Sequence, residues 1–77
     1  MTTYSFAASV QHEDDGRWSA WISALPGCAA WGSSKSEALN ALADAAQAYV
    51  ADMLDADETV PRREISAAEG PLVTVKV

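Results

Sequence analysis

Residues 34–56 are the longest periodic stretch of the sequence, and they constrain the fold most. At about 100° per residue, one side of this stretch collects apolar side chains, namely Leu39, Leu42, Ala43, Ala46, Tyr49, Val50, Met53 and Leu54. The opposite side receives Glu37, Asn40, Asp44, Gln47, Asp52 and Asp55. Ser34 and Glu37 have the spacing of a reciprocal capping box. The pattern predicts an amphipathic helix that covers one face of a small sheet.

A β-hairpin precedes this helix in the sequence. Residues 4–10 and 17–22 alternate between apolar and polar side chains, which is typical of half-buried strands. The acidic stretch 13–16 ends in a glycine that can take a positive φ, so it predicts the turn between them. The two apolar faces stay together if Val10 pairs near one of two residues, Trp18 or Ala20.

The remaining segments complete a β-β-β-α-β order. Residues 28–31 predict a short third strand, residues 62–69 have no period and predict a loop, and residues 72–77 predict a final strand. A strand that follows a helix can return to the sheet centre by a right-handed crossover, parallel to the first strand. We therefore expect a single α+β domain over residues 1–77, in which one helix covers an antiparallel hairpin sheet and the final strand returns to it.

Size and charge narrow the classes of partner. A chain of 77 residues makes a thin core, and oligomerisation is a common remedy. A net charge of −6 with five Lys and Arg residues argues against nucleic acid as the main partner. The acidity favours a basic protein partner, although it also serves solubility alone.

Localisation follows from what the sequence lacks. Its start has no basic segment followed by an apolar run, so no signal peptide is expected. No apolar stretch approaches the roughly 20 residues that span a bilayer. Cys28 is the single cysteine and cannot form an internal disulfide. We expect a cytoplasmic protein with no membrane partner.

A catalytic role finds little support in the sequence. His12 stands beside three acids, but these residues are consecutive at a hairpin tip, where solvated acids are ordinary. Cys28 lies among small residues in a predicted strand, where cysteine usually acts as a small hydrophobe. The predicted strands carry no acid constellation of the kind that binds catalytic metal ions. We expect neither an enzyme nor a cofactor.

Two tryptophans suggest a binding surface. By strand alternation, Trp21 and Trp31 lie on the sheet face opposite the helix. Exposed tryptophans usually mark an interface; in the alternative interpretation, the loop at 62–71 or a twist of the sheet covers them. The predicted partner-binding residues are these two tryptophans and the acidic turn, that is Glu13, Asp14, Asp15, Trp21 and Trp31.

The order and spacing of several short motifs resemble the HicB family of antitoxins. The similarity covers nearly the whole chain, and its motifs are Tyr4-Ser5-Phe6, Asp15-Gly16-Arg17-Trp18, Leu25-Pro26-Gly27-Cys28, Gly32, Ser34, Glu37-Ala38-Leu39, Tyr49 and Val60-Pro61. The resemblance implies a partial ribonuclease-H-like fold of β-β-β-α-β order. It also implies an antitoxin that binds and occludes a HicA-type toxin, a small basic mRNA endonuclease, and that forms homodimers or homotetramers.

Three features depart from the family pattern. Ser23 stands where proline is frequent, and the two tryptophans occupy positions that are more often polar. Many members carry a C-terminal helix-turn-helix or ribbon-helix-helix module, for which this sequence has no room, so direct operator binding is not expected. The alternative function is a stand-alone oligomeric domain with a regulatory or scaffold role and no toxin partner.

Overall fold

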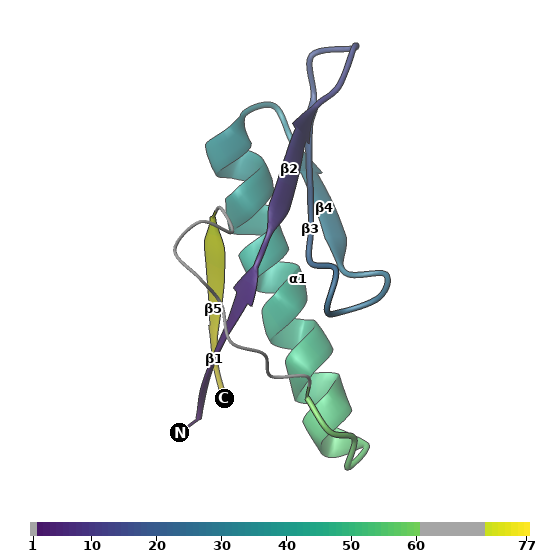
Figure 1. The fold of residues 1–77 in the computed structure, drawn as a ribbon, viewed down its shortest axis with the longest axis vertical. Coiled ribbons are helices and arrows are strands. Elements are labelled where there is room, and N and C mark those ends of the chain that lie inside the picture. The colour runs from purple at the N-terminus through teal and green to yellow at the C-terminus, as the bar shows by residue number, and fades with distance from the viewer. Residues whose placement is uncertain (1, 61–70) are drawn as a thin grey trace.

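The elements follow the predicted β-β-β-α-β order, with the first strand divided in two. The computed structural model describes residues 2–60 and 71–77. The elements are β1 (Thr3–Ala7), β2 (Ser9–His12), β3 (Trp18–Trp21), β4 (Ala29–Gly32), α1 (Lys35–Asp55) and β5 (Leu72–Lys76) (Figure 1). The α+β class is therefore confirmed. The loop predicted at 62–69 lies outside the described residues.

The strands form two antiparallel sheets, which are joined because β1 of one sheet continues directly into β2 of the other. Strands β2, β3 and β4 pair in that order, and β1 pairs with β5. Val10 lies opposite Ala20, one of the two predicted partners. The Ala8 N–H donates to Pro71 O, whereas the Glu13 N–H donates to Arg17 O. Alternate residues of a strand direct their peptide groups to opposite edges. Strands β5 and β3 therefore lie on opposite sides of the continuous segment formed by β1 and β2.

The direction predicted for the final strand was wrong. Strand β5 runs antiparallel to β1, with Phe6 opposite Val73, and β1 is its only pairing partner among the described residues. A final strand parallel to β1 would start near the C-terminal end of the helix (Figure 1). Helix α1 has 21 residues and spans about 32 Å, whereas the connection after it can extend to about 50 Å. That length is sufficient to bring the chain back along the helix before β5 begins.

The helix begins with the predicted cap, but the reciprocal hydrogen bond of the capping box differs. The Glu37 N–H donates to Ser34 Oγ at 3.1 Å, as a capping box requires. The Glu37 carboxylate does not return to the Ser34 N–H. It accepts from the Ser33 N–H at 3.3 Å and from the Ser33 hydroxyl at 2.9 Å. The carboxylate therefore fixes the residue that joins β4 to the helix.

A narrow stripe of the helix packs on the sheets. Its buried residues recur every four positions, at Ala38, Leu42, Ala46 and Val50. The predicted apolar face is largely right, because Leu39, Tyr49 and Met53 are half-buried against this core. Leu54 is the exception, at 42% exposed. It lies one turn past Val50, where the helix extends beyond the β2–β4 sheet (Figure 1).

Two polar side chains tie the helix to other elements. Gln47 was predicted to face water only, yet its Nε2 donates to Lys76 O at 2.7 Å and its Oε1 accepts from the Lys76 N–H at 3.3 Å. The amide thus pairs with β5 as a neighbouring strand would. The Tyr49 hydroxyl donates to Pro26 O at 2.8 Å, which joins the helix to the β3–β4 turn.

Helix and sheet approach each other closely at Gly32, the last residue of β4. A Cβ at this position would lie 2.6 Å from the Ala38 backbone nitrogen and 2.9 Å from the Glu37 carbonyl carbon. Real Cβ atoms do not approach backbone atoms so closely, and backbone cannot move aside as a flexible side chain can. A side chain at position 32 would therefore push the first helical turn off the sheet.

We accordingly expect Gly32→Ala to lower the free energy of unfolding by about 2–3 kcal/mol through overpacking. Chemical denaturation of the two proteins measures this difference. Ser36→Ala, at an exposed position in the first helical turn, serves as the control and should stay within about 0.5 kcal/mol of the parent. Equal stability of Gly32→Ala and the parent protein would contradict the close approach.

Candidate functional site

The acidic turn is a tight three-residue loop at the end of the β2–β3 hairpin. The Glu13 N–H donates to Arg17 O at 2.7 Å, and the Gly16 N–H donates to Glu13 O at 3.0 Å. Gly16 has φ +92°, the left-handed conformation that closes a three-residue hairpin loop. The predicted turn is confirmed. The tip extends past the N-terminal end of α1 (Figure 1), so the helix does not cover it.

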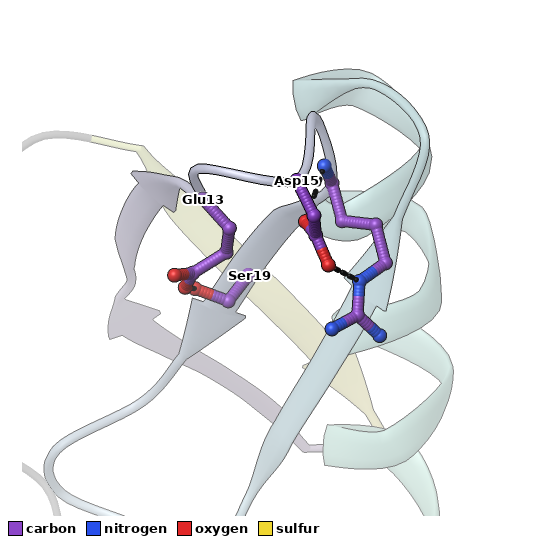
Figure 2. Close-up of polar contacts among 4 residues, drawn as sticks. Glu13, Asp15 and Ser19 are labelled. Atoms are coloured by element: carbon purple, nitrogen blue, oxygen red, sulfur yellow. Dashed lines mark hydrogen bonds and ion pairs between the residues drawn. The ribbon is translucent and has the colours of Figure 1, made fainter.

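An ion pair organises one side of this turn. The Asp15 carboxylate accepts from the Arg17 backbone N–H at 3.0 Å and from Arg17 Nε at 2.8 Å (Figure 2). The backbone donor, followed by the guanidinium, holds the pKa of Asp15 below its ordinary value. Both side chains are more than half exposed, so the pair orders the turn more than it stabilises the fold.

A second acid of the turn is held from the strand. The Ser19 hydroxyl donates to Glu13 Oε1 at 2.7 Å (Figure 2). Ser19 lies in β3 and is 7% exposed, the one buried polar residue described. Its hydroxyl leaves the second carboxylate oxygen of Glu13 without a protein donor among the described residues. The hydrogen bond therefore fixes the carboxylate and keeps it available to a ligand.

The register of the sheet brings a tryptophan to the same place. Trp31 of β4 lies directly opposite Ser19 of β3. Successive side chains of a strand point to opposite faces, and the neighbouring Ala30 is buried toward the helix. Trp31 therefore lies on the other face, with 56% of its surface exposed. Strand β4 is also the edge of its three-stranded sheet.

These residues enclose an open hollow of about 430 Å³ at the tip of the hairpin. Its lining is Glu13, Asp14, Asp15, Arg17 and Trp31. Three carboxylates and one guanidinium leave it a net charge of −2. The hollow thus combines an aromatic surface with an excess of negative charge, which is the chemistry that attracts a cation.

Four of the five predicted binding residues meet in this hollow, and Trp21 does not. Trp21 is half-buried and lies opposite Ser9 on one side and Ala29 on the other. That row of the sheet is two residue pairs further from the hairpin tip than the row of Trp31. A surface that included both tryptophans would extend from the hollow along the open face of the β2–β4 sheet.

Sequence reasoning missed two residues of the site, Arg17 and Ser19. Strand alternation could have indicated both residues, because odd-numbered positions of β3 and the residue before it share the face of Trp21. An arginine two residues after Asp15 can reach back across a three-residue loop. A serine on that face lies diagonally across the hairpin from Glu13, because Ser19 lies opposite Gln11 and Glu13 lies opposite Arg17.

The described residues around the turn form neither a metal site nor a nucleophilic site. The His12 ring stacks on Trp18 at a centroid distance of 4.5 Å and 7° between planes, on the sheet face opposite Glu13. In residues 2–60 and 71–77, no three His, Cys, Asp or Glu side chains group as metal ligands. Cys28 is buried, and burial raises the pKa of its thiol, so it suits a core position more than a nucleophile.

The same described part of the chain contains no helix with the length and apolar character to cross a membrane.

Comparison with known proteins gives one sequence family and one similar structure. Residues 6–69 match a family described as the HicB-like antitoxin of bacterial toxin–antitoxin systems. The fold is similar to the crystal structure of the N-terminal domain of the antitoxin HicB from Burkholderia pseudomallei, with a TM-score of 0.70 and 16% identity. That alignment covers 99% of this chain and 98% of the other. No match is found among curated proteins.

The ion pair of the turn makes a titration prediction. Because the backbone donor contributes most to the lowered pKa of Asp15, Arg17→Ala should raise this pKa only part of the way to its ordinary value. Carbon-detected NMR titration of the carboxyl groups measures it. A carboxyl whose folded pKa is depressed stabilises the fold above its unfolded pKa of about 3.9 and loses that contribution as the pH falls through the folded pKa.

Full recovery of the ordinary pKa in Arg17→Ala would instead assign the effect to the guanidinium. Lys35→Ala, which also removes one positive charge but lies outside the turn, should leave the Asp15 titration unchanged.

Proposed function

This chain belongs to the HicB-like antitoxin family of bacterial toxin–antitoxin systems, and we propose that it is an antitoxin whose partner is a HicA-type toxin. In this proposal the chain acts in the cytoplasm as a single domain over residues 1–77, as a homodimer or homotetramer. It binds the toxin, a small basic mRNA endonuclease, and has no catalytic activity of its own.

The observation that carries this proposal is the exposure of Trp31 beside three carboxylates in one hollow. A tryptophan that is 56% exposed on β4, the edge strand of the described sheet, supports a protein interface. The surrounding acids and the net charge of −6 select a basic partner over an acidic or neutral one.

Inhibition by occlusion follows from what a ribonuclease surface must do. A protein that cleaves RNA needs basic residues that contact the phosphates. An acidic surface on the antitoxin competes for those same residues, so binding and inhibition are one event. Such a mechanism requires complementary charge and exposed aromatic contact area. It requires no nucleophile, general base or metal ion from the antitoxin.

The alternative is a stand-alone oligomeric domain with a regulatory or scaffold role. The open edge of β4 supports this alternative. The Ile22 N–H donates to Cys28 O, so by alternation the peptide groups of Ala29 and Trp31 face away from β3. A second copy of the chain could add a strand there. The two functions differ in whether another protein is required.

Affinity capture of the tagged chain from its host, read by intact-mass spectrometry, tests the proposal. We expect a small basic protein in stoichiometric amount, and added chain should block its RNA cleavage. Capture of the bait alone as a dimer or tetramer, with the candidate toxin confirmed to be expressed, would favour the stand-alone domain.

Charge reversal at the turn gives a kinetic prediction. Asp14→Lys should slow association with the captured toxin about fivefold at low salt and weaken the salt dependence of the rate. Stopped-flow or surface-based kinetics at several ionic strengths measures both. The matched control is Asp44→Lys, an exposed acid on the helix, which should change the rate less than twofold. Equal effects of the two variants would remove the turn from the interface.

A further inference from the structure

We propose that the hollow at the hairpin tip is a receptor for one arginine side chain of the partner, with the guanidinium over the Trp31 indole and against Glu13 and Asp14. This inference names the group recognised at the proposed interface, and it rests on the proposed function for the source of that arginine.

The aromatic half of the receptor is an unpartnered surface. Trp31 is 56% exposed, β4 ends the sheet on that side, and the two ring stacks found in the described residues involve other aromatics. Arg17 lines the same hollow, but its Nε is turned to Asp15 at 2.8 Å. The indole is therefore free to receive a cation from outside.

The carboxylates of the acidic half differ in whether a positive charge within the chain compensates them. Asp15 is neutralised by Arg17, whereas Glu13 is only oriented by the neutral Ser19 hydroxyl. Asp14 makes no hydrogen bond or ion pair within the part of the chain that the structure describes. Two uncompensated carboxylates next to an indole match a guanidinium, which stacks on an aromatic face and donates from its edge.

The charge of the chain decides among occupants of this surface. A second copy would bring another net charge of −6 to a hollow that is already negative, and like charges placed together are unfavourable. A neutral apolar side chain would cover Trp31 but would desolvate the carboxylates without pairing them. An arginine satisfies both halves at once.

The direct test is a two-dimensional NMR titration of the full chain with a capped tetrapeptide that contains two arginines. We expect the indole N–H signal of Trp31, assigned from Trp31→Phe, to move more than those of Trp18 and Trp21. A peptide with citrulline, the neutral isostere of arginine, should bind about 10-fold more weakly, and a lysine peptide about 2- to 5-fold more weakly.

Variants separate the receptor from general attraction between opposite charges. Trp31→Leu and Asp14→Asn should each weaken binding of the arginine peptide about 3- to 10-fold. Leu72→Ala removes an apolar side chain that is also 56% exposed, and Asp44→Asn removes a distant exposed carboxylate; both should bind as the parent does. Asp14→Asn leaves every strand intact, so it decides the matter if Trp31→Leu lowers the melting temperature.

The outcomes distinguish this inference from the proposed function, because the peptide titration needs no toxin. Equal binding of the arginine and citrulline peptides, or shifts spread along the helix with the Trp31 signal unmoved, would overturn the receptor. Toxin capture that is equal for the parent and Trp31→Leu would also overturn it and leave the antitoxin role standing. Peptide binding at Trp31 without any captured toxin would support the receptor and contradict the function.

Discussion

The close contact between the end of β4 and the first turn of α1 governs the rest of the structure. Gly32 has no side chain, so the helix can begin almost on top of the strand that precedes it. Along the buried stripe of the helix, the small Ala38 and Ala46 alternate with the larger Leu42 and Val50. Without the contact at Gly32, the stripe would stand away from the sheet and the thin core would lose its density.

The same geometry leaves the opposite face of the β2–β4 sheet without a covering layer among the described residues. One helix can bury one face, and α1 contacts β2, β3 and β4 there and also contacts β5 of the other sheet. Polar and small residues make the open face tolerable in water, namely Ser9, Gln11, Ser19 and Ala29. The two tryptophans are the exceptions, because Trp21 is half-buried on this face and Trp31 is exposed. The exposure of an aromatic ring thus follows from the small size of the fold.

Local patterns predicted what depends on neighbouring residues, and they failed where distant residues decide. Hairpin alternation limited the partner of Val10 to Trp18 or Ala20, and the structure has Ala20; the spacing of Ser34 and Glu37 located the helix start. The direction of β5 is set by pairing between residues far apart in the sequence, such as Phe6 and Val73, which no periodicity records. The contact of Gln47 with Lys76, 29 residues apart, depends on that direction and was therefore also missed.

The site shows the same division between local and long-range information. Its acids are adjacent in sequence and its tryptophans follow strand alternation, so both could be named from the sequence. Their meeting depends on register, because Trp31 reaches the acids only by lying opposite Ser19. A shift of that register by one residue would send the indole to the helix face. The pairing that buries Ala20 and Ala30 together is thus also what holds an exposed aromatic ring beside the charged turn.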